Sequence, residues 1–217
     1  MDLFEQRQAL VRCARALAHG GLSHGSSGNV SVRTKGGFVI TPTGIGFEAL
    51  TPQQLVELSA EGVSDPAQLH PSSEWRFHRD LYRTQADVNA IVHVHSPYAT
   101  ALACARRSIP PFHYMVAAAG GDSIPCAPYA TFGTQALSDA IINTLNGRRA
   151  CLLANHGSVA TGEDLQKAHD LAQEVEFLAK VYVLTQRIGG SELLTDEEMR
   201  VVLEKFTSYG QQKQPVA

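Results

Sequence analysis

The sequence lacks a long hydrophobic run, a strong net charge and any paired-cysteine motif. No apolar stretch in its 217 residues approaches the roughly 20 residues that a membrane-spanning helix needs. The N-terminal segment MDLFEQRQALVRCARALAHGG mixes charged residues with apolar ones, unlike the continuous hydrophobic stretch of a secretory signal. We therefore expect a cytoplasmic protein with no membrane partner.

The charge balance and the cysteines exclude further classes. A formal net charge of -3 and a pI near 6.3 do not provide the basic face that nucleic-acid binding requires, so we expect no nucleic-acid partner. The four cysteines show no CxxC spacing, which is typical of reduced thiols rather than of a disulfide framework. No segment matches the Walker or dinucleotide-binding pattern, and nucleotide binding is unsupported.

Hydrophobic periodicity and capping residues predict several helices. The first begins behind Asp2 and ends at the glycine pair 20–21, and the last begins at Thr195, which forms a capping box with Glu198. The longest is expected from about residue 163 to 188, behind Thr161. Further helices are expected after Thr51 and over residues 71–83, 96–107 and 134–147.

Strands are predicted from alternating or short apolar segments. NVSVR at 29–33 and GFVIT at 37–41 form a hairpin around the turn at 35–37, and AIVHVH at 90–95 and ACLLAN at 150–155 are two further strands. The mixed order predicts one α/β domain with a partly antiparallel sheet. We place this domain at residues 1–210 and a loose tail at 211–217.

Two histidines stand two positions apart in the predicted strand at 90–95. Side chains at i and i+2 share one face of a strand, so His93 and His95 project together, as two ligands of one metal would. His156, with Gly157 behind it to allow a turn, is the best-placed third ligand. The alternative is that these are ordinary histidines with ordinary hydrogen bonds, and spacing alone leaves that open.

Glu74 is the acidic residue expected near these histidines. It falls in the first turn of the helix predicted at 71–83, where the helix dipole stabilises a glutamate in many proteins. Beside a divalent cation it could instead be a fourth ligand or a general base.

Three loops of small residues are candidates for anion binding: GSSGNVS at 25–31, TPTG at 41–44 and PSS at 71–73. Glycines, hydroxyls and free amides at strand and helix ends make concave sites that fit a phosphate. Taken alone, each loop is better explained as a turn or a cap.

Taken together, SSGNVSVR, ITPTGIGFEAL, PSSEWRFH, HVH, RSIP, HYMVAAAGGDSIPCAPYATFGT, NHG and VVLEKFTSYG resemble the class II aldolase/adducin family. The resemblance runs from the first helix to Gly210 and implies a largely antiparallel central sheet flanked by helices. It also implies a zinc-dependent lyase that reversibly cleaves L-fuculose 1-phosphate, or a related 5-deoxyketose 1-phosphate, to dihydroxyacetone phosphate and L-lactaldehyde or a related aldehyde. The family's assembly is a cyclic homotetramer with sites between subunits.

The resemblance also assigns roles by motif. His93, His95 and His156 bind one Zn²⁺ per subunit, and Glu74 is the resting fourth ligand and the acid/base. Tyr114 and Tyr209 serve the aldehyde side, partly across a subunit boundary, and Phe132 shapes an apolar pocket. The phosphate is held by Gly28, Asn29, Thr43, Gly44, Ser72 and Ser73.

The sequence departs from the family pattern in two places. NHG replaces a frequent HHG, and Ser26 stands in the pocket loop where threonine is usual. Both changes leave the predicted ligands in place. Alternatives are cleavage of methylthioribulose or 5-deoxyribulose 1-phosphate, epimerisation or decarboxylation of a related substrate, and a non-catalytic adducin-like module, which the retained histidines and Glu74 disfavour.

Overall fold

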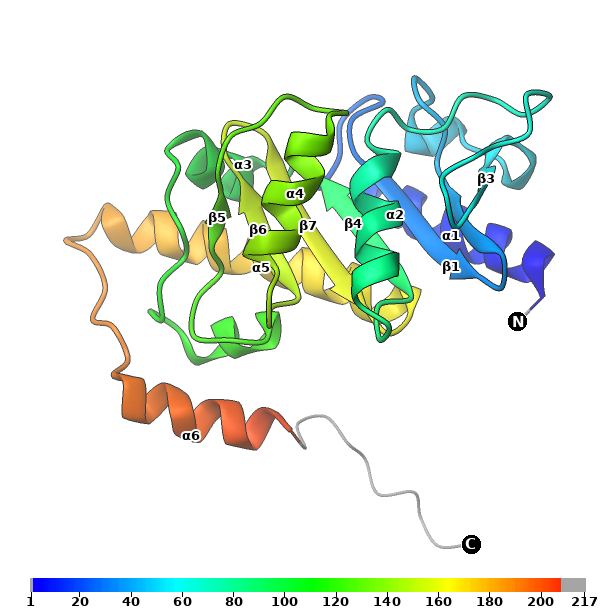
Figure 1. Cartoon of the computed structure of the whole chain (residues 1–217). Helices are drawn as coiled ribbons and strands as arrows, with labels where there is room; N and C mark the ends of the chain where they lie inside the picture. The colour runs from blue at the N-terminus through cyan, green and yellow to red at the C-terminus, as the bar shows by residue number, and fades with distance from the viewer. Residues whose placement is uncertain (1, 208–217) are drawn as a thin grey trace, which may run out of the picture.

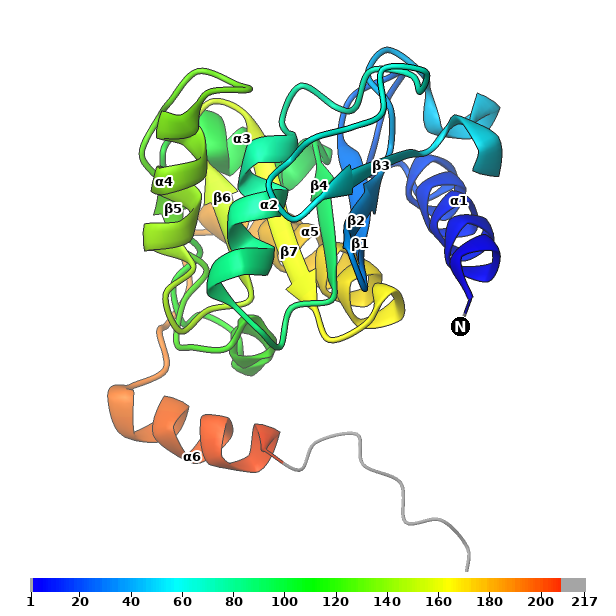
Figure 2. The same cartoon turned by 45° about the vertical axis from the view of Figure 1, so that its right-hand side comes forward.

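The computed structural model describes residues 2–207, and these residues form one seven-stranded sheet with helices on both faces (Figures 1 and 2). The strands are β1 (Asn29–Thr34), β2 (Gly37–Ile40), β3 (Val56–Ser59), β4 (Ala90–Val94), β5 (Cys126–Ala127), β6 (Ala150–Leu153) and β7 (Gly157–Gly162). Their order is β3-β2-β1-β4-β7-β6-β5, and every pair is antiparallel except β5 with β6. The predicted α/β class with a largely antiparallel sheet is confirmed.

Six α-helices and three short 3-10 helices surround the sheet in the described part of the chain. The α-helices are α1 (Leu3–His19), α2 (Trp75–Thr84), α3 (Pro97–Cys104), α4 (Gln135–Thr144), α5 (Leu165–Gln186) and α6 (Asp196–Phe206). The 3-10 helices are η1 (Phe47–Ala49), η2 (Pro52–Gln54) and η3 (Tyr114–Ala119). Within residues 2–207, no helix is long and apolar enough to cross a membrane.

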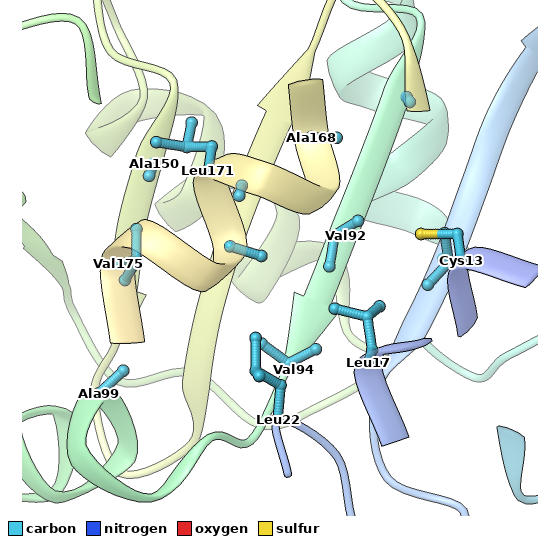
Figure 3. Packing of buried hydrophobic residues seen from close by; sticks show 14 of the residues in the cluster. Cys13, Leu17, Leu22, Val92, Val94, Ala99, Ala150, Ala168, Leu171 and Val175 are labelled. Carbon is cyan, nitrogen blue, oxygen red and sulfur yellow. The ribbon is translucent and has the colours of Figure 1, made fainter. Parts of the chain in front are cut away.

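The two faces of the sheet bury separate hydrophobic clusters. In β4, Val92 and Val94 belong to the cluster under α1, α3 and α5, whereas Ile91 belongs to the cluster under α2 and α4. Figure 3 shows Val92 and Val94 on the side where α1 and α5 pack. Because side chains alternate along a strand, His93 lies on the same side as Ile91, and its ring contacts Phe77 of α2 edge-on at 5.9 Å between centroids.

Helix ends follow the predicted capping residues in most places. Asp2 and Glu5 form a capping box on α1, and Thr195 and Glu198 form one on α6. The longest helix differs, because Asp164 caps α5 and Thr161 lies inside β7.

Sequence reasoning missed β3, β5 and β7. β7 has the sequence GSVATG and is central in the sheet, between β4 and β6, with all six residues buried. A strand covered on both faces need not alternate polar and apolar residues, and small residues here admit close packing. A Cβ at Gly162 would lie 2.4 Å from the backbone nitrogen of Ala168, so glycine permits the first turn of α5 to pack there.

Candidate active site

His93 is held in a single orientation at the carboxyl end of β4. Its side chain is fully buried, and its Nδ1–H donates to the carbonyl oxygen of Ser158 on β7 at 2.9 Å. With the proton at Nδ1, the lone pair lies at Nε2. A backbone carbonyl behind a histidine in this way is the usual arrangement for metal-ligating histidines.

His95 and His156 reach the same point from two other segments. His95 follows the last residue of β4 rather than lying inside the strand, and His156 lies in the turn between β6 and β7. The three imidazoles offer ligand nitrogens that all lie within 4.8 Å of one another, with Nε2 of His95 at 3.0 Å from Nε2 of His93. Two nitrogens bound tetrahedrally to one zinc are about 3.3 Å apart, given bonds of ~2.05 Å.

The backbone around His156 is unusually constrained. Asn155 adopts a left-handed conformation with φ of 57°, and Gly157 passes so close to β4 that a Cβ would lie 2.4 Å from the carbonyl oxygen of Val94. The Asn155 side chain accepts a hydrogen bond from Arg106 Nε at 3.0 Å. Asparagine tolerates the left-handed region better than most residues, and this turn aims His156 toward β4.

The segment after His95 is fixed by a carboxylate from α5. Ser96 at the N-cap of α3 makes no side-chain cap hydrogen bond. The carboxylate of Glu176 instead accepts from the backbone N–H groups of Tyr98 and Ala99, each at 2.9 Å. This contact fulfils the role of an N-cap from another helix and ties the chain beyond His95 to α5.

Glu74 completes the cluster. The prediction placed it in the first helical turn, but α2 begins at Trp75 and Glu74 is its N-cap residue, with no side-chain cap hydrogen bond. Its Oε2 lies 3.2 Å from Nε2 of His93, and its Oε1 lies 3.5 Å from Nε2 of His156. Freed from capping the helix, the carboxylate faces the three imidazoles.

The donor set fits a divalent cation. Oε1 of Glu74 is buried and has no hydrogen-bond partner, and in the neutral ring of His93 the Nε2 lone pair points toward Oε2. A buried oxygen without a partner is costly, and so is a lone pair facing a carboxylate. A cation among three imidazole nitrogens and one carboxylate removes both costs, and this is a ligand set that zinc accepts.

The ionisation states of the cluster favour metal binding. Burial raises the pKa of Glu74, but the charges of His93 and His156 and the Asn29 hydrogen bond outweigh it and bring the pKa to about 2. Burial lowers the pKa of His95 and of His156 to about 4, with neighbouring imidazoles acting in the same direction. Burial likewise lowers the pKa of His93, but Glu74 and the Ser158 carbonyl raise it overall. At neutral pH the cluster therefore presents an ionised carboxylate and two neutral imidazoles.

A cavity of about 310 Å³ opens beside the cluster. Glu74, His95 and His156 lie in its wall. So do most of the residues predicted to hold a phosphate or to shape the pocket: Ser26, Gly28, Asn29, Thr43, Ser72, Ser73 and Phe132. Gly44 is the one predicted phosphate residue that does not line it. Three loops that are distant in sequence therefore meet beside the three histidines and Glu74.

Backbone pairing holds two of these loops together. Pro42 and Pro71 form an isolated antiparallel bridge, the Ser72 N–H donates to Thr41 at 3.0 Å, and the Thr43 N–H donates to His70 at 3.1 Å. The third loop passes over β4 at Gly28, whose φ is 84° and where a Cβ would lie 2.6 Å from the carbonyl oxygen of His93. Only glycine fits this approach.

The outer wall comes from the segment before α4, where sequence reasoning missed a residue. Tyr129 lines the cavity beside Phe132, and both are more than half exposed. Arg76 Nη1 donates to the carbonyl oxygen of Gly133 at 2.8 Å and fixes this segment to α2. Tyr129 lies within the long block that carries the family resemblance, which was the available signal.

Of the two predicted tyrosines the structure describes Tyr114, and it does not bring this residue to the cavity of the same chain. Tyr114 opens η3, which lies at the opposite end of the sheet from the carboxyl end of β4 (Figure 1), and it does not line the cavity. The Ala119 carbonyl at the end of η3 accepts from Arg149, just before β6, whereas His156 follows the other end of that strand. Tyr209 and the tail at 211–217 lie outside the described residues.

The sequence comparisons identify the family. The family model for the Class II Aldolase and Adducin N-terminal domain matches residues 8–183. The chain belongs to this family. The resemblance seen in the motifs is confirmed across most of the chain.

Three relatives in this family are similar over nearly their whole length. The chain is 49% identical over 205 residues to the L-fuculose phosphate aldolase of Escherichia coli strain K12, covering 94% of each chain. It is 47% identical over 209 residues to a 5-methylthioribulose-1-phosphate/5-deoxyribulose-1-phosphate aldolase of Rhodospirillum rubrum, covering 96% of this chain and 94% of the relative. Its fold matches a solved L-fuculose 1-phosphate aldolase with a TM-score of 0.90 and 40% identity, covering 94% of this chain and 96% of the other.

Proposed function

We propose that this protein is a metal-dependent aldolase that reversibly cleaves L-fuculose 1-phosphate, or a related 5-deoxyketose 1-phosphate, to dihydroxyacetone phosphate and L-lactaldehyde or a related aldehyde. The observation that carries this proposal is the convergence of three imidazole nitrogens and the Glu74 carboxylate in the wall of one cavity. The names of the relatives, all aldolases of ketose 1-phosphates, support the reaction.

His93, His95 and His156 are the proposed ligands of one Zn²⁺ per subunit, with Glu74 as the resting fourth ligand. When bound, zinc supplies the positive charge that stabilises negative charge developing on the substrate oxygens. The chain itself holds the ligand directions: Ser158 fixes the ring of His93, and the constrained turn at 155–157 fixes that of His156.

Glu74 is the proposed acid/base. Its carboxylate is ionised at neutral pH, is nearly buried and is oriented by the Nδ2 of Asn29, which donates to Oε2 at 3.0 Å. In the direction of synthesis it accepts a proton from the carbon beside the carbonyl of dihydroxyacetone phosphate, and in cleavage it returns a proton to that carbon.

The loops around the cavity are the proposed phosphate anchor. Ser72 and Ser73 stand just before the start of α2, where the helix dipole favours an anion. Gly28, Asn29, Thr43 and Gly44 provide the other sides. A phosphate held here keeps the reacting carbons in reach of Glu74, and positioning of this kind lowers the barrier to reaction.

The aldehyde side is proposed to need a second copy of the chain. Tyr114 and Tyr209 are the proposed proton donor and organiser, and Phe132 lines the pocket of the same chain. Since Tyr114 lies away from its own cavity, a tyrosine of a neighbouring subunit in a homotetramer is the proposed source. The tetramer and a cytoplasmic location stay predictions.

The identity of the aldehyde is a second question, because the two named relatives differ in substrate and are almost equally similar, at 49% and 47% identity. Cleavage of 5-methylthioribulose or 5-deoxyribulose 1-phosphate is therefore the second candidate. A pocket that accepts a methyl group discriminates against a slightly larger apolar end by only about 1–3 kcal/mol.

A coupled assay for dihydroxyacetone phosphate tests the proposal. Zinc-loaded protein is incubated with L-fuculose 1-phosphate, 5-methylthioribulose 1-phosphate and 5-deoxyribulose 1-phosphate, and kcat/KM is compared. Release from at least one, abolished by a chelator and restored by zinc, supports an aldolase. No release from any of them, with folded and zinc-loaded protein, contradicts it and favours the epimerase or decarboxylase alternative.

A further inference from the structure

A chain of buried polar side chains leads from Glu74 into the layer between β1 and α2. Asn29 Nδ2 donates to Glu74 Oε2 at 3.0 Å, and Asn29 Oδ1 contacts Nε2 of His78. Nδ1 of His78 lies 2.6 Å from Oγ of Ser31, which in turn lies 2.7 Å from the hydroxyl of Tyr82. All five side chains are more than nine-tenths buried, and His78 and Ser31 are wholly so.

The direction of each hydrogen bond in this chain follows from the first. A carboxylate only accepts, so the amide nitrogen of Asn29 faces Glu74 and its oxygen faces His78. His78 must then carry its proton on Nε2 and accept at Nδ1. Ser31 donates to that nitrogen, and its oxygen is left to accept from Tyr82.

The surroundings of His78 favour this neutral form. Its ring stacks on Phe77 with centroids 4.2 Å apart, and burial lowers its pKa to about 3. Tyr82, the last residue of this hydrogen-bond series, is fixed by Arg33, whose guanidinium lies over the phenol ring at 4.9 Å, and by the ring of Phe38 at 5.5 Å. The series therefore ends at a side chain that is held in place.

We infer that His78 is a positioning residue: by donating to Oδ1 of Asn29 it holds that amide with its nitrogen toward Glu74, and so fixes the carboxylate that acts as the base. The inference rests on the proposed function for the identity of the reaction, although the hydrogen-bond geometry stands without it.

The amide needs such a partner because its two ends differ little in shape. Rotated by half a turn, Asn29 would point its oxygen at the Glu74 carboxylate and lose a charge-assisted hydrogen bond. Nothing within the amide itself prevents the rotation. The Nε2–H of His78 does, because it is a donor and only the oxygen end of the amide can accept its hydrogen bond.

The tautomer of His78 can be measured without substrate or metal. In ¹⁵N-histidine-labelled protein, long-range ¹H–¹⁵N spectra are expected to show one ring with Nε2 protonated and Nδ1 unprotonated, unchanged between pH 8 and about pH 5 because burial keeps the ring neutral. The signal is assigned by its loss in His78→Gln. A ring with the proton on Nδ1, or one that gains a second proton in this range, overturns the inference.

The functional test is exchange of hydrogen between dihydroxyacetone phosphate and D₂O, which follows removal of the C–H proton by Glu74 without any aldehyde. His78→Leu in the zinc-loaded enzyme is expected to lower the exchange kcat by roughly 10–100-fold while KM changes less than about threefold. His78→Gln carries an amide N–H close to the position of Nε2 and is expected to recover most of the rate.

Two further variants remove the next two members of the hydrogen-bond series, which lie progressively farther from Glu74. Ser31→Ala, which frees the tautomer, is expected to be weaker in effect than His78→Leu, and Tyr82→Phe weaker still. Thr161→Val is the matched control: its hydroxyl is buried and bonds the carbonyl oxygen of Arg149, at the far end of β7 from the site. A purely structural role would make the rate loss follow the melting temperature rather than this order, and would overturn the inference.

The outcomes separate this inference from the proposed function. If the native enzyme does not exchange hydrogen, the proposed function fails, and the tautomer spectrum decides on His78 alone. If the native enzyme exchanges and folded, zinc-loaded His78→Leu does so at the same rate, the positioning role is wrong. If His78→Leu does not fold, the exchange rate of Ser31→Ala and the tautomer spectrum decide whether the positioning role holds.

Discussion

Nε2 of His93 lies 3.2 Å from Oε2 of Glu74, and the other ring nitrogen of His93, Nδ1, donates a hydrogen bond to the Ser158 carbonyl oxygen. The contact joins the carboxyl end of a central strand to the residue at the N-cap position of α2. Two electron-rich atoms at this distance need a proton or a cation between them to be stable. The predictions below concern that contact and the segments that hold it in place.

Replacing Glu74 with glutamine is expected to lower kcat for aldol cleavage by about 10²–10⁴-fold, because an amide cannot accept the C–H proton. The side chain keeps its size, so circular dichroism and the melting temperature should match the native protein closely. Full cleavage activity in a folded, zinc-loaded Glu74→Gln variant would show that another residue is the base.

Removing the carboxylate that caps α3 is expected to destabilise the protein. Glu176→Ala leaves the N–H groups of Tyr98 and Ala99 without an acceptor, at a loss of about 1.5–3 kcal/mol in the free energy of unfolding, measured by urea denaturation. Glu176→Gln retains one acceptor and should lose less. Gln173→Ala, on the exposed side of the same helix, is the control, and an equal loss there would mean that the cap is not the cause.

The left-handed backbone conformation at Asn155 leads to a prediction about zinc affinity. Asn155→Gly is expected to keep the native zinc affinity, whereas Asn155→Val should destabilise the turn by about 1–2 kcal/mol and weaken zinc binding, since a β-branched residue disfavours φ of 57°. Competition with a chromophoric chelator measures the affinity. Equal affinity in the two variants would show that this backbone conformation does not aim His156.

Asp80 gives a pH dependence that is separate from the cation cluster. Burial raises its pKa, but hydrogen bonds from Arg79, Gln135 and Ser138 lower it overall, below its ordinary value of 3.8. A group whose pKa is lower in the folded state stabilises the protein above its unfolded pKa, and that stability is lost as pH falls through the folded value.

The comparison of native protein with Asp80→Asn tests this sign. The variant should be less stable at neutral pH, and the difference in the free energy of unfolding should shrink as the pH falls below 3.8. Urea denaturation of both proteins across this range is the measurement. A difference that stays constant or grows toward acid would contradict the assigned hydrogen bonds.

Local patterns in the sequence predicted much of the fold, because caps and alternation act over short distances. The cap at Asp2, the capping box at Thr195 and the hairpin around residues 35–37 are present as predicted. β7 was missed since GSVATG has no periodicity of its own and becomes a strand only through pairing with β4 and β6. Propensity cannot replace such neighbours.

The site shows the same division. The spacing of His93 and His95 and the turn after His156 pointed to three converging imidazoles, and the structure brings them together with Glu74. His78 gave no signal, because its role depends on α2 packing across β1, where it meets Asn29 and Ser31. The position of Tyr114 at the far end of the sheet likewise could not be predicted from the sequence alone.

X-ray absorption at the zinc edge of the purified, zinc-loaded protein tests the central claim most directly. One zinc per chain is expected, with three imidazole nitrogens and one or two oxygens at about 2.0–2.2 Å, and one imidazole fewer in His156→Ala. A protein that takes up no zinc, or a shell containing sulfur at about 2.3 Å from one of the free cysteines, would contradict the assignment of His93, His95, His156 and Glu74 as the metal site.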